Sequence, residues 1–472
     1  MGANTASFKT DVTGAVAMRA VDWVAPERVY RAMAGRPGFL WLDSASGMDG
    51  LGRWSYMMWA PRQVISGHKG AYSHSISNGA RRKISDPFQA VGQILAQSPR
   101  RPMDGAPPFT GGVAGFFGYG LLSITEPSTR LRPKPTAAEG DVWIGVYDCV
   151  AAFDHQRNEL ILAANPGAAD QEKALDQMEE MIARAQSGVH HPPTARPTGH
   201  NTAVASNFTR QEYMQAVEKT RRYIERGDIY QANIAQRFSA EDRFGHELYP
   251  RLRAINPAPF GAYLNTGAAR ILSASPERFI QLKGSHAQTR PIKGTRPRGR
   301  TAQEDNFLKL ELINSEKDQA ENVMIVDLLR NDFSKVCLPH SVQAPRLCAL
   351  EAHPTVFHLV STVTGQLRPG VAPVELLVNT FPGGSITGAP KIRAMEIIDE
   401  LEPDPRGAYC GAMGYIGYNG DMDMNIIIRT MVAAGGKVHF HAGGGITWLS
   451  DPAEEYQETM DKAQALIKAV SG

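Results

Sequence analysis

The sequence predicts an α+β protein built on large antiparallel β-sheets. Strand-like and helix-like segments come in groups along the 472 residues instead of alternating strictly, and such grouping is typical of antiparallel sheets with segregated helices. The length corresponds to two or three domain-sized units, or to one large intertwined core. Between residues 20 and 165 the pattern predicts short strands and turns rather than helices.

The first part of the chain ends in a predicted linker. Strands are expected at 39–44, 53–59, 142–150 and 159–163, followed by a surface helix at 170–186. Residues 187–206 have the Pro-, Gly- and Ser-containing composition of a linker, so His190 and His191 are expected to be linker residues and not metal ligands. We therefore predict an N-terminal region at 1–205 and a second domain at 206–472.

The second domain begins with a capping box, Thr209 with Glu212, which predicts the start of a helix. Further strands are expected at 229–238, 260–264, 271–283, 410–418, 424–434 and 437–441, and helices at 303–332, 388–401 and 452–470. The glycine-rich loops at 383–391 and 443–445 lack the Lys-Ser/Thr ending of a phosphate-binding loop. They indicate at most backbone amides that face a small anion.

Composition excludes several classes of protein. A formal net charge of +2 argues against a dedicated polyanion binder. The four cysteines are widely spaced without a C-x-x-C pair, which fits a reducing compartment and gives no zinc or disulfide framework. We find no secretory signal and no apolar run near the roughly 20 residues that span a bilayer. A cytoplasmic protein is expected.

Candidate chemistry centres on Lys293, which stands before a Gly-Thr pair where backbone can approach a ligand closely. The alternative is that this segment is a solvated basic loop without a catalytic role, because Lys293 is flanked by Arg290, Arg296, Arg298 and Arg300. Separately, Glu455 and Glu458 share one helix face, and carboxylates from two helices, with Glu321, are a typical Mg²⁺ arrangement. The alternative there is a solvated face with Glu458 paired to Lys462.

Several ordered motifs resemble the chorismate-utilising enzyme family, which includes the large subunits of anthranilate synthase and aminodeoxychorismate synthase. The motifs stand at 291–299, 321–332, 384–391, 428–430, 442–445 and 454–459. The resemblance implies an anthranilate synthase component I-like fold, in which large antiparallel sheets pack as a sandwich with helices outside. It also implies that 206–472 is the chorismate-binding catalytic domain.

The resemblance implies that the residues at two positions, 293 and 231, distinguish which reaction a member of this family catalyses. The resemblance associates Lys293 with amination of chorismate at C4, in 4-aminobenzoate and folate biosynthesis, because anthranilate synthases have alanine there. Gln231 replaces the water-activating lysine of isochorismate and salicylate synthases. Lys293 would be the nucleophile, Glu277 the acid that protonates the leaving hydroxyl, and Mg²⁺ would be held by Glu321 and Glu458 with Glu455 nearby. Such an acid needs a pKa raised by burial.

The resemblance also implies substrate contacts, a second pocket and a partner. Substrate would contact Gly294, Thr295, His358, Tyr409, Arg429, Gly443, Gly444 and Gly445. His358 could equally be a satisfied core histidine, and Lys391 is either a carboxylate contact or a cap of the glycine loop. A tryptophan pocket would comprise Ser44, Arg53, Pro259, Phe260 and Gly261. Cys410 lacks the glutaminase setting G-x-C-x-G, so a separate glutamine amidotransferase is expected to supply ammonia.

Two rival functions remain from the sequence. One is an anthranilate synthase component I that carries lysine at position 293. The other, from a different class, is a non-catalytic subunit that binds chorismate or tryptophan and scaffolds a partner. Identification of the product formed from chorismate and ammonium separates all three.

Overall fold

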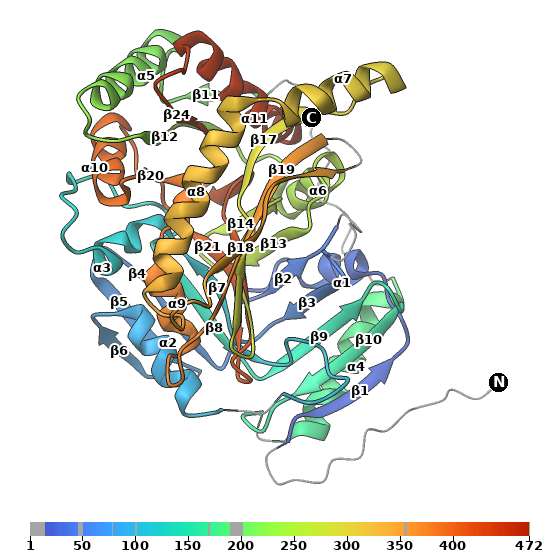
Figure 1. Ribbon diagram of the computed structural model, residues 1–472. Helices are drawn as coiled ribbons and strands as arrows, with labels where there is room; N and C mark the ends of the chain where they lie inside the picture. Colours follow the sequence, from blue (N-terminus) through green and yellow to red (C-terminus); the bar gives the residue numbers. More distant parts are fainter. Residues whose placement is uncertain are drawn as a thin grey trace.

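The fold is a sandwich of two antiparallel sheets with helices on both outer faces, as the computed structural model of the chain shows (Figure 1). The structure describes residues 15–45, 51–77, 79–99, 102–168, 170–188, 202–353 and 356–471. His190 and His191 of the predicted linker lie outside these residues. Within them, each sheet has twelve strands.

The first sheet contains both the first and the last strand of the described chain. Its spatial order is β1 (Ala17–Val21), β10 (Glu159–Ala164), β9 (Cys149–Asp154), β3 (Trp54–Met58), β2 (Leu40–Asp43), β13 (Phe260–Asn265), β14 (Arg270–Ser275), β23 (Thr430–Ala434), β24 (Lys437–Ile446), β12 (Gln231–Glu241) and β11 (Ala205–Ser206), with β20 (Gly388–Ala389) also paired to β12.

The second sheet faces the first. Its order is β17 (Ile292–Pro297), β19 (Val356–Gln366), β16 (His286–Thr289), β15 (Arg278–Lys283), β22 (Met422–Ile426), β21 (Ala412–Gly417), β7 (Gly112–Phe117), β8 (Val142–Tyr147), β4 (Gln63–His68), β5 (Ala71–Ile76) and β6 (Arg81–Ile84), with β18 (Gln343–Ala352) paired to β19.

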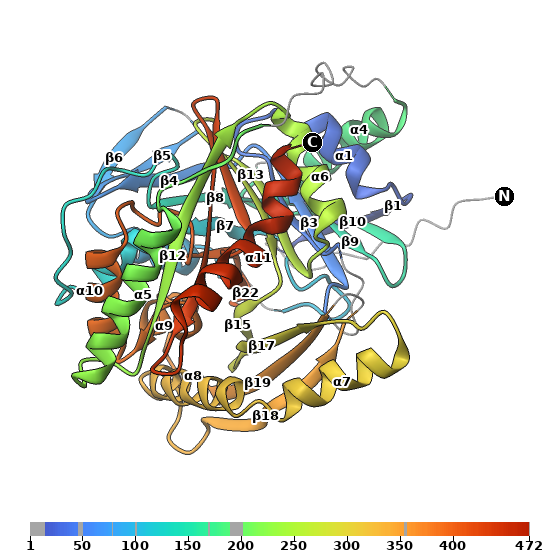
Figure 2. The ribbon, with the colours of Figure 1, turned by 90° about the horizontal axis from the view of Figure 1, so that it is seen from above.

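The helices divide between the two outer faces. Against the first sheet lie α1 (Pro26–Met33), α4 (Gln171–Gln186), α5 (Arg210–Glu225), α6 (Leu248–Ile255), α10 (Lys391–Leu401) and α11 (Pro452–Ser471). Against the second lie α2 (Pro87–Ala96), α3 (Leu122–Thr125), α7 (Ala302–Ile313), α8 (Glu316–Ser334) and α9 (Pro373–Thr380). Figure 2 shows α11 lying beside α5 and α6. No helix of the described residues is long and apolar enough to cross a membrane.

Several apolar cores hold the layers together in the described part of the chain. Between the sheets, Leu264 and Ile271 of the first pack with Phe116, Trp143 and Tyr415 of the second. Separate cores join each outer face to its helices. Burial of these side chains is the main stabilising contribution, at about 25 cal/mol per Å² of apolar surface. The predicted sandwich with outer helices is confirmed.

Both sheets contain strands from each side of residue 206. β13 pairs with β2, for example, and β21 pairs with β7. The boundary therefore divides the sequence but not the sheets. The prediction of no helices between residues 20 and 165 was wrong, since α1, α2 and α3 lie there. Pro26 and Pro87 begin α1 and α2, and proline at the first helical position is a start signal.

Several predicted elements are divided in the structure. Segment 271–283 forms β14 and β15 in different sheets, and 424–434 forms β22 and β23 in the same way. Segment 303–332 forms α7 and α8, because Ser315 caps a new helix. Helix 388–401 starts only at Lys391, because the preceding Pro390 lies in an extended conformation. The helices at 170–186 and 452–470 and the capping box of α5 are confirmed.

Candidate active site

Glu277 lies where the chain crosses from the first sheet to the second, between β14 and β15. Its backbone carbonyl accepts a hydrogen bond from the Ile426 amide (3.1 Å). The Ser275 hydroxyl donates to the Ile426 carbonyl (2.6 Å). Ile426 ends β22, just before the chain returns to the first sheet. The two segments that pass between the sheets are therefore hydrogen-bonded to each other. Glu277 is consequently held in place and is only 5% exposed.

The carboxyl of Glu277 is poised to exchange a proton near neutral pH. Burial raises its pKa from 4.5 to about 7, and the charge of nearby Lys293 opposes part of that rise. Burial disfavours the charged form of a carboxyl, and a pKa near the working pH suits a general acid. The burial-raised pKa that the sequence analysis required of Glu277 is present.

Lys293 lies in a bulge of β17, not at the end of a strand. The pairing of β17 with β19 shifts between Ile292 and Thr295, which leaves Lys293 in the irregular stretch. A Cβ added at Gly445 of β24 would lie 3.5 Å from Lys293 Nζ. Within the described part of the chain, Nζ forms no hydrogen bond or ion pair. The amine therefore reaches the end of the first sheet and is available to a ligand.

Gly294 makes the bulge possible. Its φ of +80° favours glycine, and an added Cβ would come within 2.9 Å of Leu312 Cδ1 and 3.0 Å of Asp318 Cβ. The helices α7 and α8 can therefore pack this closely against β17 only because Gly294 has no side chain.

Gln231 lies beside Lys293. A Cβ at Gly445 would fall 2.0 Å from Gln231 Nε2, so Gly445 leaves the space that this amide occupies. Gln231 is 2% exposed, and its Oε1 is buried without a hydrogen-bond partner among the described residues. An unpaired buried acceptor costs about 1–3 kcal/mol. The oxygen is therefore suited to a donor that arrives with a ligand.

Three carboxylates from two helices border the same site. Glu321 lies on α8, and Glu455 and Glu458 lie on one face of α11, as their spacing predicts. Burial raises the pKa of Glu321, and Lys293 opposes the rise. Burial, helped by the charge of Glu458, raises the pKa of Glu455. These carboxylates therefore resist being charged together.

Two lysines offset part of this negative charge. Lys317 pairs with Glu455 (3.3 Å), and Lys462 pairs with Glu458 within α11. The Glu458 side chain is 46% exposed; although its partial burial raises the pKa, the Lys462 ammonium outweighs that effect and the net shift of the pKa is downward. The intrahelical pair that the sequence offered as an alternative is confirmed.

The carboxylates fit a cation that is shared with substrate. Glu455 Oε2 is buried without a hydrogen-bond partner in the described structure, and a Cβ at Gly444 would lie 2.9 Å from it. Among the described residues, no three His, Cys, Asp or Glu side chains are grouped so that they alone could hold a metal ion. Mg²⁺ usually takes one or two protein carboxylates, with waters and substrate oxygens completing its shell. The donor set is compatible with that arrangement.

His358 is a neutral imidazole on β19. Burial lowers its pKa to about 4, and the charges of His353 and Arg429 act in the same direction. Thr295 Oγ1 lies 2.8 Å from His358 Nδ1, and the two residues are cross-strand partners. His358 thus helps to orient β17, the strand that contains Lys293. The Nδ1 atom of His358 already has a hydrogen-bond partner in Thr295.

Arg429 lies at the return crossing, between β22 and β23. Its φ of +52° is uncommon for a residue with a side chain. Its NH1 donates to the Lys462 carbonyl (3.0 Å), and its own carbonyl accepts from the Ala274 amide (3.1 Å). Burial lowers the pKa of Arg429. The crossing therefore fixes a half-buried guanidinium next to α11.

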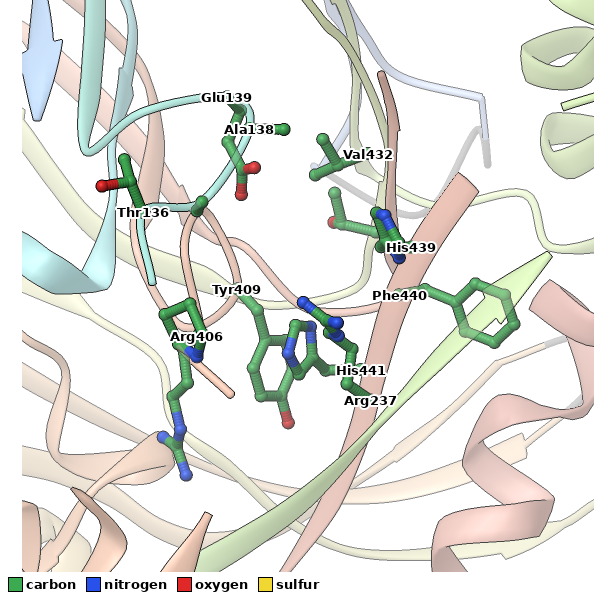
Figure 3. A pocket seen from close by; sticks show the side chains of 13 residues that line it. Thr136, Ala138, Glu139, Arg237, Arg406, Tyr409, Val432, His439, Phe440 and His441 are labelled. Carbon is green, nitrogen blue, oxygen red and sulfur yellow. The ribbon is translucent and has the colours of Figure 1, made fainter. Parts of the chain in front are cut away.

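Tyr409 lines a different cavity, of about 170 Å³, between β12, β23, β24 and residues 136–139 (Figure 3). Its ring stacks on His441 (4.9 Å between centroids), and Arg237 and Arg406 also line the space. Neither Lys293 nor Glu277 is among the lining residues. The predicted contact of Tyr409 with a substrate carboxylate stays a prediction.

Gly443, Gly444 and Gly445 lie inside β24, and the expectation of a glycine loop after a strand at 437–441 was wrong. They pair with residues 233–235 of β12. A Cβ at Gly443 would meet the Ile234 carbonyl oxygen at 2.5 Å, so this glycine permits close strand pairing. Gly444 and Gly445 instead leave room beside the carboxylates and Lys293.

Four other basic residues singled out in the sequence form ion pairs with carboxylates. Lys391 is 7% exposed and its Nζ also donates to the Thr380 carbonyl (3.2 Å), so it braces the glycine-rich segment at 383–391. The ion pairs join Lys391 to Asp332, Arg290 to Glu351, Arg298 to Asp305, and Arg296 to both Glu311 and Asp318.

A separate pocket of about 270 Å³ brings together all five residues of the predicted tryptophan pocket: Ser44, Arg53, Pro259, Phe260 and Gly261. Arg53 is held by Asp154 (2.6 Å), and the Ser44 hydroxyl donates to the carbonyls of Trp54 and Pro259. Arg278 and Asp423, which form an ion pair, line the same space.

Sequence reasoning missed Lys317 and Ser450 as partners of Glu455. The Ser450 hydroxyl donates to Glu455 Oε1 (2.6 Å). Ser450 lies five residues before Glu455 and just before α11 begins, a proximity that could have indicated it. Lys317 lies four residues before Glu321 on α8, so the helical spacing placed it near Glu321 but gave no sign of its pairing with Glu455 on α11.

The chain belongs to the family of chorismate binding enzymes, whose model matches residues 39–468. It is 39% identical over 450 residues to aminodeoxychorismate synthase component 1 of Klebsiella aerogenes, covering 94% of this chain and 96% of that protein. It is also 40% identical over 395 residues to anthranilate synthase component 1 of Thermus thermophilus, covering 83% and 84% of the two chains.

A solved structure has the same architecture. The crystal structure of anthranilate synthase component I from Streptococcus pneumoniae matches with a TM-score of 0.76 and 30% sequence identity, over 88% of this chain and 92% of that one. This agreement confirms the predicted component I-like fold.

Proposed function

We propose that this chain aminates chorismate at C4 to give 4-amino-4-deoxychorismate, the reaction that leads to 4-aminobenzoate. One observation carries the proposal: the unpaired amine of Lys293 shares a site with Glu277, a buried carboxyl whose pKa is near 7. The relative from Klebsiella aerogenes, an aminodeoxychorismate synthase component 1, supports the same activity.

Lys293 acts first as a nucleophile. Its nitrogen forms a bond to ring C2, the diene electrons shift, and the bond between C4 and its hydroxyl oxygen breaks. Hydroxide is a poor leaving group, so Glu277 donates its proton and water departs. Ammonia then bonds to C4, the electrons shift back, and the C2–nitrogen bond breaks to release Lys293 as a neutral amine. The ammonium formed at C4 returns a proton to the Glu277 carboxylate, which restores the acid. The sum is chorismate plus ammonia giving aminodeoxychorismate plus water.

Glu321, Glu455 and Glu458 would hold Mg²⁺ together with a substrate carboxylate. A bound Mg²⁺ supplies Lewis-acid polarisation of that carboxylate. The chain's own contribution is to orient the ring: Arg429 offers a fixed guanidinium fork for the second carboxylate. Gln231 presents its unpaired Oε1 beside Lys293.

A separate glutamine amidotransferase supplies the ammonia in this proposal. The word "component" in the relatives' names supports a partner subunit. Cys410 is buried, with its pKa raised by burial to about 12, which is unsuitable for a glutaminase nucleophile. We also propose a cytoplasmic location, which agrees with the four free cysteines.

Anthranilate synthase activity is the nearest alternative, because relatives with that name are similarly close. The test is to incubate the chain with chorismate, Mg²⁺ and ammonium and to identify the product by mass and fluorescence. We expect aminodeoxychorismate that retains its enolpyruvyl group. Release of anthranilate would contradict the proposal, and unchanged chorismate would favour a non-catalytic binding subunit.

The second pocket is proposed to bind tryptophan. Arg53 and Ser44 provide polar groups, and Phe260 with Pro259 provides apolar surface, in a volume of about 270 Å³. Whether it serves regulation or stability is decided by assaying amination with and without tryptophan.

A further inference from the structure

We propose that the cavity of about 170 Å³ between β12, β23 and β24 is a second ligand site, in which Arg237, His439 and His441 bind a small hydroxycarboxylate. We call it the Arg237 cavity. Neither Lys293 nor Glu277 lines it, so the inference concerns a separate place in the molecule. It does not rest on the proposed amination.

Strand pairing gathers the three nitrogen-bearing side chains on one face of the first sheet. Arg237 of β12 is the cross-strand partner of His441 of β24, and directly opposite residues have Cβ atoms about 4.5–5.5 Å apart. His439 stands two residues before His441, and side chains two residues apart in a strand point to the same face. All three line the cavity (Figure 3), so one small ligand can contact them together.

Arg237 supplies a cation with donors that remain available. Its Nη2 forms an ion pair with Asp404 (3.2 Å), whereas its Nε and Nη1 form no hydrogen bond to any described residue. The other arginine of the cavity, Arg406, differs because its Nε and Nη2 are bound to Glu402 and its Nη1 to the Ile386 carbonyl. The planar fork of a guanidinium suits a carboxylate. Arg237 is therefore the group that selects an anionic ligand.

The two histidines add hydrogen-bonding atoms that lack partners. His439 Nδ1 and His441 Nε2 are buried and make no hydrogen bond within the described structure. Burial lowers the pKa of both imidazoles, and the charge of Arg237 acts in the same direction, so both rings are neutral near pH 7. A neutral imidazole has one donor nitrogen and one acceptor nitrogen. A ligand hydroxyl can donate and accept, so it can pair with either kind of nitrogen.

The acid in the cavity does not oppose such a ligand strongly. Glu139 is the only acidic side chain among the described lining residues. Burial raises its pKa, although the Ala408 amide, which donates to Glu139 Oε1 (2.8 Å), opposes part of the rise. A raised pKa favours the neutral carboxyl, which limits repulsion of a ligand carboxylate.

The cavity lies just beneath the surface. Residues 136–139 lie across it from the two histidines (Figure 3), and Thr136 and Ala138 among them are exposed. Val432 and the Tyr409 ring provide apolar wall for the remainder of a ligand. A site that is mostly apolar with a few convergent polar groups is typical of small-molecule binding.

The test uses three probes that differ by one group. Mandelate has a carboxylate with an adjacent hydroxyl, phenylacetate lacks the hydroxyl, and mandelamide lacks the charge. Each would be titrated by calorimetry into the parent chain, Arg237→Gln and His439→Phe. Lys437→Gln is the matched control, because Lys437 is an exposed cation two residues before His439 on the same face of β24 and does not line the cavity.

We expect mandelate to bind the parent chain saturably, and phenylacetate and mandelamide to bind about tenfold more weakly or worse. Arg237→Gln and His439→Phe should each weaken mandelate binding about tenfold or more, as expected when a charge-assisted or buried hydrogen bond is lost. Lys437→Gln should stay within about twofold of the parent chain. Equal mandelate affinity in cavity and control variants would overturn the proposal, and so would the absence of mandelate binding. An unchanged Tm in either cavity variant separates a lost contact from unfolding.

Nuclear magnetic resonance of the parent chain with ¹⁵N-labelled histidine locates the ligand. Mandelate should shift the ring-nitrogen resonances of His439 and His441, which are assigned by His439→Phe and His441→Phe. A shift confined to His358 would place mandelate near Lys293 and overturn the proposal. Failure of the proposed function is distinct, because none of these measurements involves turnover of chorismate.

Discussion

At the scale of single residues, the site depends on a contrast between two side chains. Lys293 keeps an amine without a protein partner, whereas the surrounding arginines at 290, 296 and 298 are all paired with carboxylates. Glu277 is buried so that its carboxyl can hold a proton near neutral pH. These three arginines are therefore engaged in ion pairs, which argues against the alternative of a solvated basic loop, and Lys293 differs from them in having an unpaired amine.

Replacing Glu277 should slow the amination and remove the dependence of its rate on pH near 7. With its pKa raised to about 7, Glu277 is protonated below that pH, so kcat/KM for chorismate should fall as pH rises through about 7. We expect Glu277→Gln to be slower by about 10²–10⁴-fold, the usual range for a general acid. The profile must be measured at constant free ammonia. A parent profile that does not fall through pH 7 would contradict the assignment.

His358 should make the free energy of unfolding depend on pH between about 4 and 6.5. Its folded-state pKa of about 4 lies below its ordinary value of 6.5. The unfolded chain therefore binds more protons between these values, and stability should decrease as pH falls from about 6.5 to 4. His358→Gln should flatten the urea-unfolding midpoint across this range. A midpoint that varies equally in both proteins would refute this origin.

At the scale of elements, the residues proposed for catalysis lie in two places. Glu277 and Arg429 lie where the chain passes from one sheet to the other, and the carboxylates lie near the N-terminal ends of α8 and α11. Within 271–283, Pro276 was a sign in the sequence that the strand would be interrupted. Segment 424–434 gave no such sign, because the positive φ of Arg429 that marks its break is visible only in the structure. Local patterns predicted which segments are extended, whereas long-range pairing decided which sheet each joined.

The bulge of β17 should not tolerate a side chain at position 294. Gly294→Ala would force a positive φ on alanine and contact with Leu312 and Asp318. We expect a loss of about 1–3 kcal/mol in the free energy of unfolding, measured by urea denaturation. Gly284→Ala is the control, because it also has a positive φ but no atom within 4 Å of its added Cβ. Equal losses would show that the contacts contribute nothing.

The carboxylates of α8 and α11 should set the metal requirement. Glu321→Gln and Glu455→Gln each remove a charge from the proposed Mg²⁺ donor set, so the Mg²⁺ concentration that gives half-maximal amination should rise at least tenfold. Isothermal titration of chorismate with and without EDTA provides a second readout. Unchanged Mg²⁺ dependence in both variants would exclude these residues as donors.

At the scale of the whole molecule, the sandwich joins regions that the sequence separates. The fold class followed from the grouping of segments and from the motifs, but the intertwining of 15–188 with 202–471 did not, because strand order in a sheet is a long-range property. The pocket at Ser44 and Phe260 is one consequence, since its walls come from both regions. The use of Glu321, Glu455 and Glu458 as metal ligands stays a prediction, and the ion pair of Lys317 on α8 with Glu455 on α11 was not foreseen.

Ligand binding in that pocket should stabilise both sheets together. Tryptophan at saturating concentration should raise the Tm of the parent chain, because a ligand that binds only the folded state stabilises it by mass action. Phe260→Ala should abolish the shift by removing apolar contact. A Tm that is insensitive to tryptophan in the parent chain would contradict the predicted ligand.

The most direct test of the central claim is the mass of the intact protein, quenched during incubation with chorismate and Mg²⁺ in the absence of ammonia. The account predicts a covalent adduct with the mass of chorismate less one water, located on Lys293 by peptide mapping. The adduct should disappear on addition of ammonium and should not form in Lys293→Ala. No adduct in the parent chain, together with undiminished amination by Lys293→Ala, would contradict it.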